Sequence, residues 1–390
     1  MRAVAPLVTP PLLFLSAASV LFAGCNKDKD AKEETETPGI VDVEEAPHDI
    51  GAWLSMKATP DGKPAIAYYD KTEDALGFAI GTISGSDVSW AKEKVDSFRD
   101  ADGLNPGDAG KYASMAIAAD GTVWIAYQDT SNGTLKYAKR DPSTAAWTTA
   151  LADVGGGRAT DAGYWASIAL APGDAPVIAH YDKTEGAVRV ARWNGTAFAG
   201  SVVYQGEDAT DTAGTVDGNA GEYAKLLITS AGQEYLAFYD HAEGSLKLAT
   251  GSGSSFSVET VDNAGDVGAW PDLVLDGGAL YIAYQDLTNQ DLKLASGSPG
   301  SFSVQTLDSG DYVGADAAIY VDGGTVGAFY FDGVANDIKR GSLGGSWSGA
   351  TLAGDDAALG YHSETVSIGG KRYVACYDYT NRTVWFSSTN

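Results

Sequence analysis

An aspartate recurs seven times along the chain, each time at the end of a short apolar stretch. In every copy a Gly or Asp lies eight residues before the aspartate, and an aliphatic residue lies six residues after it. The seven aspartates are Asp70, Asp129, Asp182, Asp240, Asp286, Asp332 and Asp378. Carboxylates accept hydrogen bonds from sugar hydroxyls or from backbone N–H groups. The series therefore predicts either ligand-binding groups or caps of the turns that follow.

Aromatic residues precede six of these aspartates by 16 or 17 positions. They are Trp53, Tyr112, Trp165, Tyr223, Trp270 and Tyr361, and the sixth copy has Gly314 and Ala315 in this region. Aromatic faces stack on the C–H faces of sugars while carboxylates accept from the hydroxyls. The two series together predict a glycan-binding face. A residue type that every repeat keeps often solves a problem common to all repeats, so a structural role is the alternative for both series: turn capping for the aspartates and packing between repeats for the aromatics.

Two connections between repeats are rich in oxygen-bearing side chains. The first spans residues 99–110 and the second residues 207–222. The first offers Asp100, Asp102, Asn105 and Asp108. Such side chains are ligands for Ca²⁺, but Leu104 stands where an EF-hand has its third ligand. We expect solvated acidic loops, with Ca²⁺ binding as the alternative, and no other cofactor or metal.

Motifs of catalytic chemistry are missing from the sequence. It has no Gly-x-Ser-x-Gly elbow, no phosphate-binding glycine loop and no His pair at metal-ligand spacing. Carboxylates are so numerous that their presence selects no general acid. The sequence therefore favours a protein without catalytic activity. A carbohydrate-active hydrolase or lyase, with carboxylates in a central pocket, is the alternative.

The element that positions both series is a repeat of about fifty residues. Each copy contains apolar segments that alternate with polar residues, as strands do, and pairs such as Asp120-Gly121 and Gly277-Gly278, which two-residue hairpins need. Four such strands form one antiparallel blade. Seven copies over residues 39–390 predict an all-β, seven-bladed β-propeller.

The two ends of the repeat region complement each other. The seventh copy stops after its third strand, and Gly39–Glu44 forms an extra strand before the first copy. Pairing them would complete the last blade and remove both free edges. This closure resembles that of WD40-type and other seven-bladed propellers, and the turn pattern of residues 39–390 resembles repeat-built bacterial surface propellers. The Ser-x-Asp-x-Gly-x-Thr-Trp motif of sialidase-like propellers is absent, so the resemblance implies architecture and no active site.

The first 24 residues have the features of a signal peptide, with Arg2 followed by an apolar run too short to span a membrane. The run ends in Leu21-Phe22-Ala23-Gly24-Cys25, which resembles the lipobox of bacterial lipoproteins. The resemblance implies a lipid anchor with palmitate on Cys25 and a place in the bacterial cell envelope, and Asn26 resembles the type sorted to the outer membrane. An ordinary cleaved signal is the alternative. Residues 25–38 are charged and predict a disordered acidic tether.

The charge of the chain limits its partners. Without Arg2 the sequence has 25 basic and 52 acidic residues, a net charge of −27. Such a surface repels phosphate backbones and anionic lipids, so we expect no nucleic acid and membrane contact through the lipid anchor alone. The sequence thus predicts a monomeric, non-catalytic binding module for a glycan or an envelope protein, with a structural scaffold as a further alternative.

Overall fold

The computed structural model describes residues 48–85, 87–98, 106–156, 161–206, 218–354 and 357–389. The described residues all belong to one compact unit, Pro38–Asn390. Cys25, the predicted tether and the predicted strand Gly39–Glu44 lie outside the described residues. Within the described ranges no helix has both the length and the apolar character needed to cross a membrane.

The described residues form 27 strands in seven sheets. The first strands of the sheets are β1 (Ile50–Ala58), β5 (Ala109–Ile117), β9 (Ala162–Ala171), β13 (Ala220–Ile228), β17 (Val267–Asp276), β21 (Val313–Asp322) and β25 (Tyr361–Ile368). The second strands are β2 (Pro64–Asp70), β6 (Val123–Asp129), β10 (Ala175–Asp182), β14 (Glu234–Asp240), β18 (Ala279–Asp286), β22 (Thr325–Asp332) and β26 (Lys371–Asp378). The third strands are β3 (Ala75–Ser84), β7 (Thr134–Arg140), β11 (Ala187–Trp193), β15 (Ser245–Ser252), β19 (Asp291–Ser298), β23 (Asp337–Gly344) and β27 (Thr383–Thr389). The fourth strands are β4 (Asp87–Asp96), β8 (Trp147–Asp153), β12 (Phe198–Tyr204), β16 (Ser255–Asp262), β20 (Ser301–Asp308) and β24 (Ser346–Ala353).

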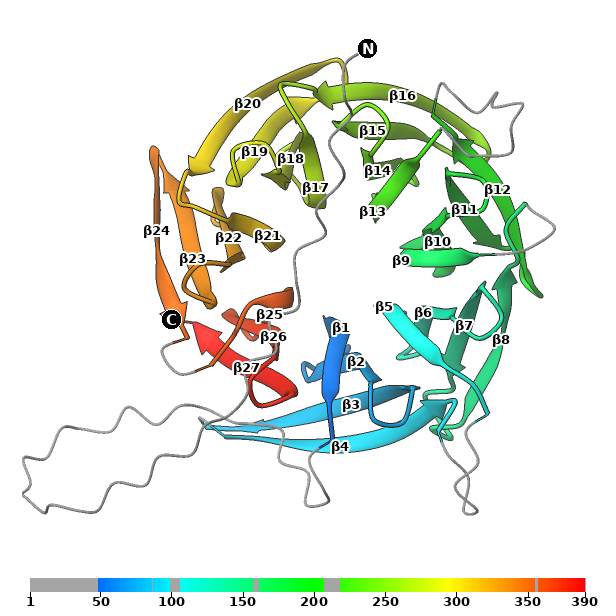
Figure 1. Ribbon diagram of the computed structural model, residues 1–390. Helices are drawn as coiled ribbons and strands as arrows, with labels where there is room; N and C mark the ends of the chain where they lie inside the picture. The colour runs from blue at the N-terminus through cyan, green and yellow to red at the C-terminus, as the bar shows by residue number, and fades with distance from the viewer. Residues whose placement is uncertain are drawn as a thin grey trace, which may run out of the picture. The chain divides into compact units, whose positions relative to one another are not determined.

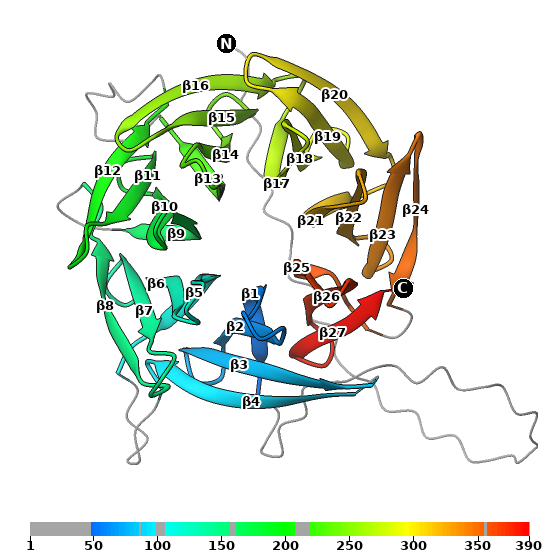
Figure 2. The ribbon, with the colours of Figure 1, turned by 180° about the vertical axis from the view of Figure 1, so that it is seen from behind.

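Each sheet is one blade of a seven-bladed propeller, numbered here in chain order. Strands that follow one another in sequence pair antiparallel, and the first strand of each blade faces the centre (Figure 1). The first strands contact their neighbours around the whole ring, including β25 and β1, and the reverse view shows the same closed circle (Figure 2). The predicted fold is confirmed. Blade 7 has three strands within the described residues, so its completion by Gly39–Glu44 stays a prediction.

The apolar core consists of seven clusters, one between each pair of adjacent blades. A glycine at the start of each first strand makes the blades' close approach possible. A Cβ atom on Gly110 would lie 2.9 Å from Cα of Leu76, and one on Gly268 would lie 2.6 Å from Cα of Leu246. Side chains larger than hydrogen therefore do not fit at these two positions. In six blades the glycine lies against the aliphatic residue six places after the central aspartate of the preceding blade, whereas Gly360, directly before β25, lies against Phe331 and Asp337. We call these seven residues the interface glycines: Gly51, Gly110, Gly163, Gly221, Gly268, Gly314 and Gly360.

At several interfaces between adjacent blades, a buried cluster of polar side chains links the two sheets. Between blades 4 and 5, Tyr284 Oη and Lys293 Nζ both donate to Asp262 Oδ2, each at 2.6 Å, and Lys293 Nζ lies 3.8 Å from Asp286 Oδ2. Asp262 ends the fourth strand of the preceding blade, so the cluster joins two sheets. We call this arrangement the interblade clamp. It recurs as Asp96, Tyr127 and Lys136 and as Asp308, Tyr330 and Lys339.

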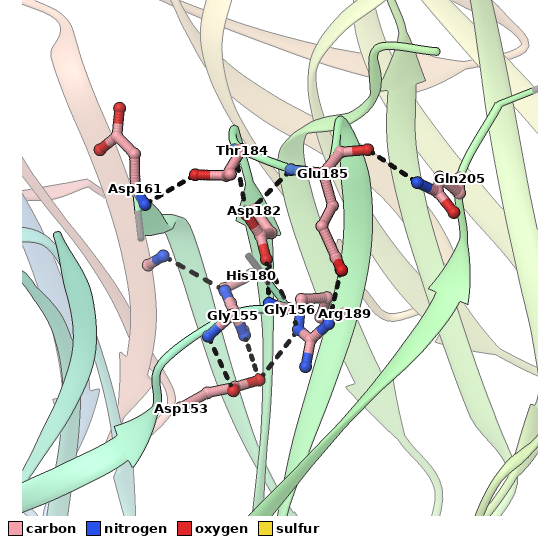
Figure 3. Close-up of polar contacts among 11 residues, drawn as sticks. Asp153, Gly155, Gly156, Asp161, His180, Asp182, Thr184, Glu185, Arg189 and Gln205 are labelled. Atoms are coloured by element: carbon pink, nitrogen blue, oxygen red, sulfur yellow. Dashed lines mark hydrogen bonds and ion pairs between the residues drawn. The ribbon is translucent and has the colours of Figure 1, made fainter. Parts of the chain in front are cut away.

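Blade 3 has a variant of the interblade clamp, shown in Figure 3, in which His180 and Arg189 replace the tyrosine and the lysine. His180 Nδ1 accepts from the backbone N–H of Gly163 at 3.2 Å, so its Nε2 is the nitrogen that donates to Asp153 Oδ2 at 3.1 Å. Arg189 Nε donates to the same oxygen at 3.1 Å. Burial opposes ionisation of Asp153, but its two partners outweigh burial and hold its pKa well below the usual range. His180 is therefore a structural residue.

The interblade clamp makes stability depend on pH, which Asp262→Asn tests. Burial opposes ionisation of Asp262, but Lys293 and Tyr284 lower its pKa below the usual 3.8. The folded state thus binds fewer protons than the unfolded state, so the clamp's contribution is complete above about pH 4 and is lost as the pH falls through the folded pKa. We expect Asp262→Asn to lower the free energy of unfolding by about 2 kcal/mol at pH 7 and by little near pH 2.

Urea unfolding at several pH values measures this difference. The exposed Asp276 at the end of β17 provides the matched control, and Asp276→Asn should change the stability by less than about 0.5 kcal/mol at any pH. A loss for Asp262→Asn that stays constant from neutral to acid pH would contradict the role assigned to the ion pair.

Candidate functional site

A bulge in each first strand turns one side chain into the central channel. The residue two places after the interface glycine has a positive φ, between 46° and 57°, in all seven blades. These residues are Trp53, Tyr112, Trp165, Tyr223, Trp270, Asp316 and His362, and we call them the mouth ring. All seven are half-buried and line one cavity of about 140 Å³.

The residue types of the mouth ring conflict with its backbone conformation. The left-handed region is open to glycine and tolerable for Asp or Asn, but it costs a bulky residue about 1 kcal/mol or more. Five blades nevertheless place Trp or Tyr there. Backbone preference does not explain aromatic residues at these positions, so their side chains must contribute something that outweighs the strain.

The aromatic side chains form a continuous belt. Trp53 lies 5.2 Å from Tyr112 between ring centroids, Tyr112 lies 5.5 Å from Trp165, and Trp165 lies 4.7 Å from Tyr223. Tyr223 lies 4.6 Å from Trp270, and Trp53 lies 5.6 Å from the imidazole of His362 on the other side. Asp316 occupies the position between Trp270 and His362 in blade order. The mouth ring therefore has a long aromatic arc and a short polar arc.

The polar groups of the aromatic arc have no hydrogen-bond partner in the part of the chain that the structure describes. Within the described residues, none of these five side chains makes a hydrogen bond to another group. Burial raises the pKa of Tyr112 and of Tyr223 well above the usual value, so both hydroxyls stay protonated. Successive ring planes are inclined by 53°, 53°, 54° and 39°. In a ring with sevenfold symmetry, side-chain planes that run parallel to the axis are rotated by about 51° from one blade to the next. The observed angles are near this value.

A network of four charges forms the floor of the cavity, where Lys225, Asp272 and Glu364 line it and Lys57 pairs with Glu364 from outside. Lys225 Nζ lies 3.3 Å from Asp272 Oδ1 and 3.3 Å from Glu364 Oε1, and Lys57 Nζ lies 3.2 Å from Glu364 Oε2. Burial opposes ionisation of Glu364, but the two lysines hold its pKa below the usual value. The two positive and two negative charges balance, so the floor as a whole is neutral.

The polar arc of the mouth ring holds one uncompensated charge. His362 Nδ1 lies 3.7 Å from Asp316 Oδ1, and it is the only basic side chain within ion-pair distance of Asp316 among the described residues. Burial lowers the pKa of His362 below 6.5, although Asp316 opposes this shift. The imidazole is therefore neutral at pH 7 and leaves the carboxylate without a counter-ion.

A second cavity, of about 410 Å³, lies beside the mouth ring between blades 3 and 4, and we call it the groove. It shares Trp165 with the central cavity, and Tyr164 and Tyr181 each lie 5.7 Å from that indole. Asn219 Nδ2 donates to Glu222 Oε1 at 3.2 Å in the same groove. Aromatic surface and hydrogen-bonding groups thus continue outward from the channel over blade 3.

The structure places five of the six predicted aromatic residues in the mouth ring. Tyr361 is the exception, because its ring packs 4.3 Å from Phe331 and 6.0 Å from Tyr379. The residue in the equivalent position of blade 7 is His362, and that of blade 6 is Asp316. Counting back from the central aspartate missed both residues. Counting two places on from the interface glycine, Gly314 or Gly360, would have found them.

The seven central aspartates cap their own turns. Each carboxylate accepts a backbone N–H from a residue two or three places later. Asp286, for example, accepts from Asn289 N and from Asn289 Nδ2, both at 2.9 Å. Six of the seven are buried, and Asp332 is half-buried. The capping alternative accounts for the whole series, and these side chains line neither the channel cavity nor the groove beside Trp165.

Three of the predicted calcium ligands, Asp100, Asp102 and Asn105, lie outside the described residues. Asp108 accepts from Tyr69 Oη at 2.8 Å and from Lys111 Nζ at 2.5 Å. Within the described ranges, no group of three or more His, Cys, Asp or Glu residues could hold a metal ion. Asp108 therefore has a structural role in joining blades 1 and 2.

Comparisons with known proteins identify the fold. No protein-family model matches the sequence, and no curated protein is similar to it. The structure is similar to a prolyl endopeptidase, with a TM-score of 0.51 and 10% identity over 88% of this chain and 50% of that one. This chain thus spans about half the length of the endopeptidase.

Two further solved structures have the same TM-score of 0.51 and 10% identity. A polysaccharide lyase matches over 86% of this chain and 89% of its own, and a dihydro-heme d1 dehydrogenase over 86% and 66%. Proteins of such different activities share the propeller. At this identity the likeness shows the fold alone.

Trp270→Gly tests whether the aromatic residues of the mouth ring stabilise the fold, as core residues do, or serve ligand binding. Glycine relieves the strain at φ 48° but loses the contact with Tyr223, so we expect the free energy of unfolding to fall by less than about 1.5 kcal/mol. Trp124, 4% exposed and packed against Trp193, gives the matched comparison, and Trp124→Ala should cost about 3–5 kcal/mol. Chemical denaturation measures both. Equal losses would assign the aromatic belt to the core.

Proposed function

We propose that this protein is a non-catalytic binding module that recognises a glycan through the mouth ring. The observation that supports this is the strained backbone of the mouth ring, which holds Trp or Tyr in five blades, with N–H and O–H groups that make no hydrogen bond within the described residues. Aromatic surface beside hydrogen-bonding groups is what a sugar ring needs. In this proposal the lipid on Cys25 anchors the propeller in the bacterial envelope, at the outer membrane, and the ligand is an envelope glycan. An envelope protein is the other candidate ligand.

The size of the central cavity fits one ring-sized group. A cavity of about 150 Å³ holds benzene, so the 140 Å³ at the mouth ring would enclose only part of one sugar residue, and the rest of that residue would project out of the cavity. The groove beside Trp165 offers a larger volume and more aromatic surface. A linear glycan could therefore place one residue in the mouth ring and the next ones over Tyr164.

A carbohydrate-active hydrolase or lyase is the second candidate, because Asp272, Asp316 and Glu364 gather in the central cavity. A general acid needs a raised pKa. Glu364 has a lowered one, and Asp272 is paired with Lys225. This arrangement favours binding over catalysis. Release of new reducing ends or unsaturated products from a polysaccharide, abolished by Asp316→Asn, would establish the enzyme instead.

The proposal predicts that replacing Trp53, Trp165 and Trp270 together by Ala weakens glycan binding at least tenfold, because each substitution removes stacking surface. Intrinsic fluorescence of the full-length protein, titrated with envelope polysaccharides and oligosaccharides, gives the affinity of the wild type, and calorimetry gives that of the variant. Tyr379→Ala is the control, because this tyrosine is 58% exposed and lies outside the mouth ring. A folded protein with a flat response across the panel would direct the search to protein partners.

The groove predicts that affinity rises with the length of the oligosaccharide. Tyr164→Ala should remove this gain and leave the affinity for a monosaccharide or disaccharide within about twofold of the wild type, because Tyr164 lies outside the central cavity. Calorimetry with a series of oligosaccharides of one composition measures both quantities. Affinity that is independent of length in the wild type would remove the groove from the site.

A further inference from the structure

We propose that the group bound in the mouth ring carries a positive charge, as the ammonium of a sugar with a free amino group does. This inference rests on the proposed function and names the class of its ligand. In the floor of the cavity each charged side chain is paired with one of opposite charge. In the mouth ring the carboxylate of Asp316 has no positively charged partner within the described residues.

The charges around the cavity leave a single negative site. Lys225 is held between Asp272 and Glu364, and Lys57 completes the neutral floor. Within the described residues, neutral His362 at 3.7 Å is the only basic side chain within ion-pair distance of Asp316, whose side chain is 17% exposed. A carboxylate withdrawn from water without a cation is unfavourable, so a bound ammonium would gain both charge pairing and hydrogen bonds there.

The aromatic arc stabilises the same charge. Neighbouring centroids lie 4.6–5.6 Å apart around the arc. In a sevenfold ring with this spacing, a point on the axis is about 6 Å from each centroid, and about 6 Å is the limit within which the face of an aromatic ring attracts a cation. The hydroxyls of Tyr112 and Tyr223 can accept hydrogen bonds from an ammonium, and the indole N–H groups can donate to sugar oxygens.

The charge of the whole protein acts in the same direction. With a net charge of −26, the protein attracts cations and repels the carboxylate or sulfate groups of acidic polysaccharides. A neutral sugar would satisfy Asp316 only by donating hydroxyl hydrogen bonds. An ammonium can come from a free amino sugar or from a choline group attached to a glycan, and binding measurements with each distinguish these sources.

Calorimetry on the full-length protein at pH 7 compares the glucosamine trimer, the N-acetylglucosamine trimer and choline. We expect the glucosamine trimer to bind roughly tenfold or more tightly than the N-acetylated trimer, because acetylation removes the charge. The preference should shrink at high salt. Choline binding that competes with the glucosamine trimer would assign the ammonium, rather than the sugar, as the feature recognised.

Asp316→Asn is the decisive variant, because Asn keeps the shape of the side chain and tolerates the left-handed φ of 50°. It should abolish the preference for the amine and leave folding unchanged. Asp311→Asn removes one charge from the exposed loop before β21 and should keep the preference. Equal binding of both trimers, or a preference that survives Asp316→Asn, overturns the cationic ligand while glycan binding stands. Absence of binding by either trimer and by every glycan of the earlier panel overturns the proposed function as well.

Discussion

The close contact between adjacent blades at the interface glycine is the constraint on which the rest of the structure depends. In six blades the backbone of the first strand packs against the start of the third strand of the preceding blade, and a Cβ atom on the glycine would lie 2.6–3.0 Å from its nearest neighbour. In blade 7, Gly360 packs against Phe331. The glycine's positive φ starts a bulge, and two residues later the chain adopts a second positive φ. That second residue faces the channel. The geometry that joins the blades therefore also creates seven equivalent positions around the axis.

The fold could be predicted from the sequence because the repeat has fixed offsets between turn, aspartate and aliphatic residue. These offsets lie within single hairpins, where local geometry fixes the spacing. The mouth ring could be predicted only in part, since the distance from its residues to the central aspartate is 17 in four blades and 16 in three. This change of one residue led to Tyr361 instead of His362. The interblade clamp was not predicted, because Asp262 and Tyr284 belong to different repeats and meet only when the blades pack.

The central aspartates, which all blades share, have a structural role, because they cap turns. The tyrosine and lysine of the interblade clamp recur at three interfaces and join sheets there. Even His180, unusual in the sequence, replaces a clamp tyrosine and stays buried. The residues that distinguish the proposed site are departures from the repeat. Asp316 and His362 differ because they replace aromatic residues at positions that face an open cavity. A change of residue type is thus informative about ligands only where the side chain can reach solvent.

The order of residues in the mouth ring also determines how a ligand would be rotated about the channel axis. A ring of seven identical side chains would offer an asymmetric ligand seven equivalent rotational states about the axis. The aromatic arc of blades 1–5 and the polar arc of blades 6 and 7 remove this degeneracy, because one side of the ligand meets rings and the other meets Asp316. Selecting one state from seven costs RT ln 7, about 1 kcal/mol of entropy at 25 °C. In return, a glycan chain bound as proposed would leave the mouth ring in a single direction, and the groove over blade 3 could receive it.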